Sequence, residues 1–112
     1  MRKLTVRAFT AILLCANYVA AQQITGSITG VVKDSQQATV ANAKVVLTNL
    51  EQGIHREGTT GTDGSFVFTQ AQPGTYNLTV EATGFKKFEQ KDVKLFASDR
   101  VSLGDITLNV GQ

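Results

Sequence analysis

The chain has 112 residues, of which 42% are hydrophobic and 18% charged, and it contains one cysteine, one histidine, one proline and no tryptophan. This length fits one small domain with a leader or tail, and a domain of this size must be stabilised by burial of a modest core. The formal net charge of +2 gives no basic excess of the kind that nucleic-acid-binding domains carry.

The first 23 residues, MRKLTVRAFTAILLCANYVAAQQ, have the three-part layout of a secretory signal peptide: basic residues, an apolar run and then small residues. The apolar run, at positions 8–16, is shorter than the roughly 20 residues that a membrane-spanning helix needs. Val19 at −3 and Ala21 at −1 predict cleavage after Ala21. We therefore expect a signal helix at 1–21, export across the inner membrane, and a mature domain at 22–112.

Cleavage at this point would change both the charge and the chemistry of the chain. The mature part keeps eight basic and nine acidic residues and no cysteine, so disulfide and thiol chemistry are excluded and no nucleic-acid partner is expected. The adjacent pair Lys86-Lys87 is interpreted as part of a solvated strand face. Cys15 raises the alternative of a lipoprotein, but Leu14 precedes it where a small residue is expected.

The mature chain shows short runs rich in Val, Thr, Ile, Leu and Phe, divided by Gly, Asp, Asn and Gln, and no helical period. This spacing is typical of an antiparallel sandwich or barrel. Runs at 28–34, 44–50 and 55–60 predict three strands, the third of them polar. The clearest strand is 75–82, where alternation places one set of side chains toward the core: Tyr76, Leu78, Val80 and Ala82.

The two runs that follow each change phase. Within 85–96 the apolar positions shift between Phe88 and Val93, and within 101–110 they shift at Gly104-Asp105. A slip of one residue reverses which face points inward, so we expect a bulge or bend in each run. Seven strands are predicted in total, and no transmembrane segment is expected in the mature chain.

Two turn signals frame the central alternating segment. Asp63-Gly64 predicts a tight hairpin turn, because glycine tolerates positive φ. Pro73-Gly74 predicts a type II turn with glycine at the left-handed corner, and Gly84 is expected to end the next strand. Five large apolar side chains are then predicted to meet on one inner face, with Val67 facing away: Phe66, Phe68, Tyr76, Leu78 and Val80.

The segment TGTDGSFVFTQAQPGTYNLTVEATGF resembles the carboxypeptidase regulatory-like domain. That family shows Thr and an acidic or small residue before Gly, then Phe-x-Phe, Pro-Gly-x-Tyr, alternating apolar residues and Gly-Phe. GSITGVVKD and VANAKVVLTN resemble its first two strands, so the likeness covers most of residues 25 to 110, with departures at 37–39 and Ala71. The matching positions are Thr60, Asp63, Gly64, Phe66, Phe68, Pro73, Gly74, Tyr76, Leu78, Val80, Gly84 and Phe85.

The resemblance implies a transthyretin-like, seven-stranded antiparallel β-sandwich that is not an enzyme and holds no cofactor. Such modules often form the periplasmic N-terminal extension of TonB-dependent outer-membrane receptors. AQQITGSITGVVKD and DITLNVGQ look like the two ends of that extension. The resemblance thus implies a periplasmic location, at or near the outer membrane, and a protein domain as partner. Whether the chain is a fragment, a truncated product or a free-standing domain stays open.

The residues themselves offer no catalytic or metal-binding set. His55 is the single histidine and is interpreted as an exposed strand residue, since a zinc site needs three or four ligands. Asp63 is the one carboxylate of TGTDGS, which favours a turn over a calcium loop. No Gly-x-Ser-x-Gly marks a nucleophile. Asn77-Leu78-Thr79 matches a glycosylation acceptor that would be idle in a bacterial protein.

Carbohydrate binding is the alternative function, because related sandwich folds include starch-binding domains. A sugar site usually needs an exposed aromatic platform with polar groups around it. Tyr76 is predicted to face the core, which leaves Phe85, Phe88 and Phe96 as candidates. A secreted hydrolase is a third hypothesis that no acid–base or nucleophile constellation supports.

Overall fold

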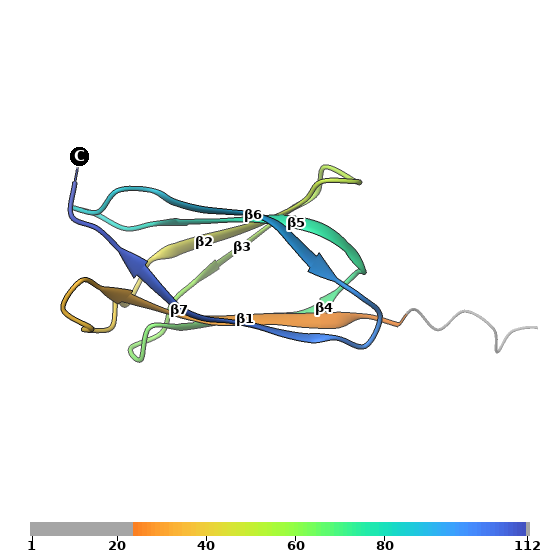
Figure 1. Ribbon diagram of the computed structural model, residues 1–112, viewed down its shortest axis with the longest axis horizontal. Coiled ribbons are helices and arrows are strands. Elements are labelled where there is room, and N and C mark those ends of the chain that lie inside the picture. The colour runs from red at the N-terminus through yellow and green to blue at the C-terminus, as the bar shows by residue number, and fades with distance from the viewer. Residues whose placement is uncertain (1–23, 112) are drawn as a thin grey trace, which may run out of the picture.

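The computed structural model describes residues 24–111, which form two packed β-sheets and no helix (Figure 1). The predicted signal peptide, its cleavage after Ala21 and Cys15 lie outside the described residues. Each predicted run corresponds to one strand: β1 (Gly26–Asp34), β2 (Lys44–Asn49), β3 (His55–Thr59), β4 (Ser65–Ala71), β5 (Gly74–Glu81), β6 (Phe88–Leu95) and β7 (Arg100–Leu108).

One sheet has the strand order β4-β1-β7 and the other β3-β2-β5-β6. All pairs are antiparallel except β1 and β7, which are parallel, so the prediction of a wholly antiparallel sandwich is wrong for the first sheet. The reason is geometric. Each connection reverses the direction of the chain, so odd-numbered strands run one way and even-numbered strands the other. Pairing the first strand with the seventh must therefore give a parallel ladder, and the chain enters and leaves at opposite ends (Figure 1).

The two predicted turns, at Asp63-Gly64 and Pro73-Gly74, both lead from one sheet to the other. β3 and β4 belong to different sheets, so the predicted hairpin at Asp63-Gly64 is wrong, although a tight turn is present there. Gly64 has a φ of 75°, and its N–H donates to the Gly61 carbonyl at 2.9 Å. Gly74 has a φ of 159° and begins β5, so the predicted left-handed corner is also wrong. Gly84 lies in the loop after β5, with a φ of 86°.

The core lies between the two sheets, and the inward residues of both contribute to it. The Phe66 and Phe68 rings, with centroids 6.0 Å apart, come from the first sheet and meet the inward residues of β5 from the second. Val67 faces away and is 60% exposed. The five side chains that alternation predicts to face inward are all buried: Phe66, Phe68, Tyr76, Leu78 and Val80.

Three of the four edge strands contain a bulge. Register shifts occur in the β5–β6 pair and the β1–β7 pair, at positive-φ residues Asp92 (60°) and Gly104 (68°), which confirms the two predicted phase changes. A third shift, unpredicted, occurs in β4 at Gln70, whose φ is 53°. The fourth edge strand, β3, pairs with β2 in continuous register. An edge without a bulge is the one most open to pairing with another chain.

Candidate functional site

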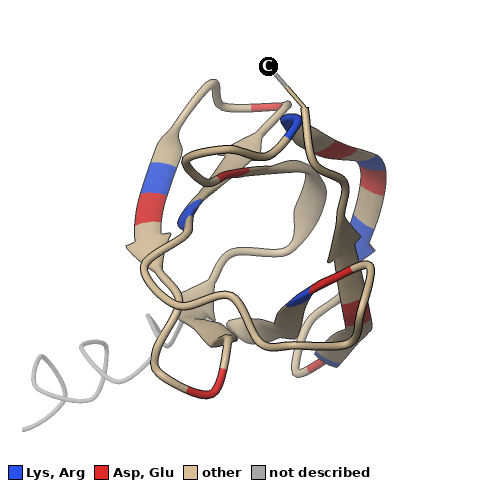
Figure 2. Cartoon of the chain, turned by 90° about the vertical axis from the view of Figure 1, so that its left-hand side faces the viewer, with Lys and Arg blue, Asp and Glu red and all other residues tan. Residues whose placement is uncertain are grey.

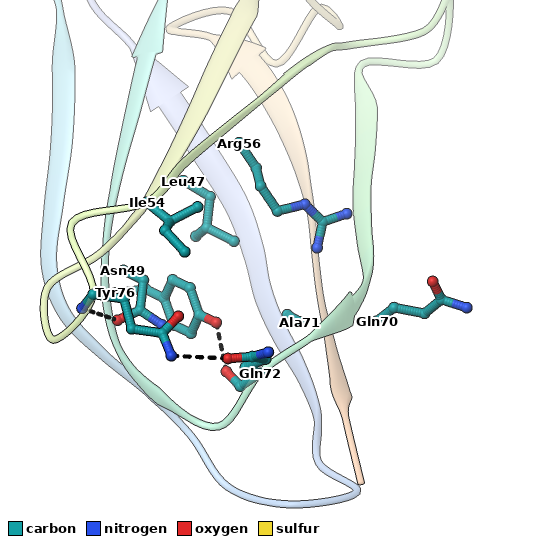
Figure 3. Close-up of a pocket in the computed structure, with 9 residues that line it drawn as sticks. Leu47, Asn49, Ile54, Arg56, Gln70, Ala71, Gln72 and Tyr76 are labelled. Carbon is teal, nitrogen blue, oxygen red and sulfur yellow. Dashed lines mark hydrogen bonds between the residues drawn. The ribbon is translucent and has the colours of Figure 1, made fainter. Parts of the chain in front are cut away.

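A cavity of about 190 Å³ opens on the side of the sandwich between β3 and β4 (Figure 3). It exists because these strands belong to different sheets, so no backbone pairing closes the space between them. Its apolar lining comes from β2, from the residue just before β3, from β4 and from β5: Leu47, Ile54, Ala71 and Tyr76. Ile54 is 56% exposed and forms part of the rim, while the other three are buried.

Polar side chains fix the loops around this cavity. The buried amide of Asn49 accepts hydrogen bonds through Oδ1 from the backbone N–H groups of Glu51 (2.9 Å) and Gln52 (3.1 Å), which shapes the β2–β3 loop. Gln52 Nε2 donates to Gln72 Oε1 at 3.0 Å, and the Tyr76 hydroxyl donates to the Gln72 carbonyl. These bonds join the β2–β3 and β4–β5 loops beside the cavity (Figure 3). The lining is therefore held in place before any ligand arrives.

Arg56 is the single charged residue that lines the cavity. Its Nη1 donates to the Thr69 carbonyl at 2.7 Å, which links β3 to β4 across the open side. Its guanidinium carbon lies 5.5 Å from the centre of the Phe68 ring, a cation–π distance. Within residues 24–111, no carboxylate forms an ion pair with Arg56. The mouth of the cavity thus carries a positive charge without a negative partner from the described chain.

The free side of β3 can be assigned from its pairing with β2. At the two ends of this pair, Asn49 N donates to Ile54 O at 2.8 Å and Thr60 N donates to Ala43 O at 3.0 Å. Hydrogen-bonded and non-bonded residues alternate along an antiparallel pair, so every second residue of β3 turns its N–H and C=O away from β2. These residues are His55, Glu57 and Thr59, and all three are exposed.

The predicted site residues fall into separate places. Of the family motif, Tyr76 lines the cavity, whereas the Asp63-Gly64 turn lies at the other end of β4. His55 is exposed on β3, as expected, with Nδ1 2.9 Å from Thr48 Oγ1. The Asp63 carboxylate accepts hydrogen bonds from Ser65 Oγ (2.7 Å) and Ser65 N (3.1 Å), which lower the pKa of Asp63.

Reasoning from sequence missed Arg56, Asn49 and Ile54, because residues 49–59 match no motif of a binding or catalytic site. Asn49 carried one usable signal: an asparagine directly after a strand commonly accepts backbone N–H groups in a turn. No group of three or more potential metal ligands lies within the described residues. Figure 2 shows acidic and basic residues interspersed around the sandwich rather than gathered in one patch.

A wider hollow, of about 550 Å³, is lined by Lys44, Glu81, Phe85 and Lys87 among others. Lys87 forms an ion pair with Glu81 at 3.5 Å, and both side chains are more than half exposed. The two charges pair with each other in water, so this hollow offers weaker grounds for a ligand than the smaller, more apolar cavity between β3 and β4.

Residues 27–109 match the family of the carboxypeptidase regulatory-like domain, which is most of the chain. The chain belongs to this family. The resemblance inferred from the Phe-x-Phe and Pro-Gly-x-Tyr motifs is thereby confirmed, and the carboxypeptidase regulatory-like domain is a non-catalytic sandwich module. No curated protein matches the chain. No helix among residues 24–111 is long and apolar enough to cross a membrane.

Several solved structures share this fold at low identity. A type II cohesin–X-dockerin complex from Acetivibrio cellulolyticus has 18% identity and a TM-score of 0.59, over 77% of this chain and 58% of that one. Hydroxyquinol 1,2-dioxygenase from Pseudomonas putida has 9% identity and a TM-score of 0.64, over 82% and 58%. The group B streptococcus pilus 2b backbone protein has 24% identity and a TM-score of 0.57, over 78% and 42%.

The chain therefore spans less than two thirds of each of these proteins. At such identities the likeness shows the sandwich fold alone, and the dioxygenase chemistry of one neighbour does not transfer to this domain.

Proposed function

We propose that this domain is a non-catalytic interaction module of a bacterial cell-envelope protein, and that it binds a protein partner at the open side between β3 and β4. The proposal rests on three features that lie together there. They are an edge strand whose outer N–H and C=O groups form no strand pair, an apolar cavity, and Arg56, which forms no ion pair within residues 24–111. Exposed edges accept strands from other chains through main-chain hydrogen bonds. Two neighbours of the same fold, a cohesin–dockerin complex and a pilus backbone protein, are themselves parts of protein assemblies.

We further propose that the module is the periplasmic N-terminal extension of a TonB-dependent receptor, or a fragment of one. The support is the family membership, the signal-like leader and the two ends that look like such an extension. The DNA downstream of codon 112 tests this context. A reading frame that continues into a plug and a barrel is expected, and a stop codon followed by unrelated sequence would contradict the receptor context.

The export and partner claims can be tested together in cells. The full chain with a C-terminal tag should appear in the periplasmic or outer-membrane fraction, and N-terminal sequencing should begin at Gln22. Crosslinking in envelope extracts, followed by purification on the tag, should give a defined adduct. A chain that stays in the cytoplasm, or one that never forms an adduct, would contradict the proposal.

Carbohydrate binding is the alternative function, and one exposed aromatic ring, that of Phe96, supports it. Phe96 is 66% exposed in the β6–β7 loop and is the most exposed aromatic side chain of residues 24–111. Tyr76 is buried and uses its hydroxyl within the fold, so it cannot serve as a platform. Titration against a polysaccharide panel, with Phe96→Ala beside the wild type, decides this alternative: binding that depends on Phe96 would favour it.

A further inference from the structure

We propose that the open side binds one extended acidic segment of the partner, which adds to β3 as a strand, inserts one aromatic or branched apolar side chain into the cavity, and places a carboxylate on Arg56. This inference rests on the proposed function and specifies the partner's chemistry. It requires three features in one place: a pairing edge, a side-chain pocket and a charge.

The pairing edge is β3. Within the described residues, β4, β6 and β7 are each interrupted by a bulge, whereas β3 runs in continuous register with its neighbour. Bulges are one of the devices by which proteins protect sheet edges. The backbone groups of His55, Glu57 and Thr59 point away from β2, so β3 offers three N–H and three C=O groups to an incoming strand. Strands of about five residues are common in sheets, so this length suffices.

The side-chain pocket is the cavity beside the Ile54–Arg56 part of the edge. An engineered apolar cavity of about 150 Å³ binds benzene, so about 190 Å³ accommodates one phenyl ring or one leucine side chain. Leu47, Ala71 and Tyr76 supply the apolar walls. Larger ligands would have to displace the loops that Asn49 and Gln72 hold together.

The charge is that of Arg56. It is held at the mouth by the Thr69 carbonyl and the Phe68 ring, and its single hydrogen bond to Thr69 leaves further guanidinium donors for a carboxylate. The adjacent acidic residue, Glu57, lies on the outer face, where it pairs with Lys44 at 3.5 Å. Side chains two positions apart share one face of a strand, so the segment should carry its apolar residue and its acidic residue at positions i and i+2.

The direct test uses the full chain, processed in the periplasm, and a synthetic heptapeptide, acetyl-Ser-Thr-Phe-Thr-Glu-Thr-Ser-amide. Amide chemical shifts of the ¹⁵N-labelled protein should move at His55, Glu57 and Thr59 as the peptide is added. Control peptides with Phe→Ala or Glu→Gln should bind at least tenfold more weakly. A peptide that is N-methylated at alternate residues should not bind, because it cannot form the ladder.

Two pairs of protein variants separate the strand pairing from the charge. The one backbone N–H that Glu57→Pro removes faces away from β2, a position where an edge strand tolerates proline. This substitution should abolish binding, while Glu57→Ala, which loses the same ion pair with Lys44, should bind like the wild type. Arg56→Met should remove the preference for the Glu peptide over the Gln peptide, while Arg56→Lys should keep part of it. Circular dichroism and thermal unfolding show whether each variant is folded.

Some results would overturn this inference. Binding of the Phe–Glu peptide that survives in folded Glu57→Pro, or the absence of β3 shifts at about 1 mM peptide, would show that β3 is not the docking edge. A wild-type dimer that Glu57→Pro abolishes would identify a second copy of this chain as the occupant instead.

The envelope crosslink distinguishes this failure from failure of the proposed function. An adduct that persists in Glu57→Pro keeps the interaction module and removes the docking site proposed on β3. The absence of any adduct with the wild-type chain removes the interaction module itself.

Discussion

The Phe66 ring on β4 occupies the space where a side chain at Gly30 on β1 would lie. These two residues are direct partners across the β1–β4 pair, and a Cβ added to Gly30 would stand 2.5 Å from Phe66 Cζ. A glycine in a central strand costs conformational entropy, but here it lets an aromatic ring lie across the neighbouring strand. The first sheet thus depends on a small residue opposite a large one.

Gly30→Ala should therefore destabilise the domain by roughly 1–3 kcal/mol, because the added methyl overpacks the core. Urea unfolding followed by circular dichroism measures the effect. The matched control is Gly58→Ala on β3, where a new Cβ would lie 3.5 Å from the Phe68 ring, an ordinary contact. Equal stabilities for the two variants would contradict the steric account.

Phe68→Ala should cost about 3–5 kcal/mol, because it empties a core position and removes the ring beneath Arg56. Val67→Ala, one residue away on the exposed face, should change stability by no more than about 0.5 kcal/mol. Thermal unfolding of both variants provides the comparison. A Phe68→Ala domain as heat-stable as the wild type would show that the inward face is assigned incorrectly.

Tyr76→Phe keeps the buried ring and deletes the hydroxyl that donates to the Gln72 carbonyl. We expect a loss of about 1 kcal/mol, typical of one hydrogen bond, with little change in the core. The Gln72 side chain also accepts a hydrogen bond from Gln52 in the β2–β3 loop. Amide hydrogen exchange should therefore rise in both the β2–β3 and the β4–β5 loops. Exchange that rises everywhere equally would indicate general destabilisation instead of a local link.

Ser65→Ala should raise the pKa of Asp63 toward its ordinary value of 3.8, since the Ser65 hydroxyl is the main cause of its lowering and the Ser65 N–H the next. A carboxyl whose pKa is lowered by folding stabilises the domain above its unfolded pKa, and this contribution is lost as the pH falls through the folded pKa. The variant should lose that contribution. NMR titration of the Asp63 carboxyl measures the shift, and Ser102→Ala, on β7, should leave it unchanged.

The strands could be predicted because the alternation of apolar and polar residues that specifies a strand lies within a short stretch of sequence. Alternation in 75–82 identified the inward set of β5, and the phase changes after Phe88 and at Gly104 identified two bulges. The bulge at Gln70 was not predicted from the sequence. The inward residue that follows this bulge is Ala71, whose small side chain gives only a weak apolar signal.

Topology and site could not be predicted in the same way. Asp63-Gly64 specifies a tight turn, but whether that turn closes a hairpin or crosses between sheets depends on which strands become neighbours, a non-local property. The cavity follows from that crossing. Arg56 therefore acquires its position only from the complete fold, by reaching Thr69 on a strand of the other sheet.

The parallel pairing of β1 with β7 has a mechanical consequence. The chain enters at the start of β1 and leaves beyond the end of β7, at opposite ends of the sandwich (Figure 1). Tension applied between the two ends would pull these neighbouring strands past each other, so that their hydrogen bonds bear the load in shear, together, rather than opening one after another. A pull along the length of the domain should therefore meet the resistance of several β1–β7 hydrogen bonds at once.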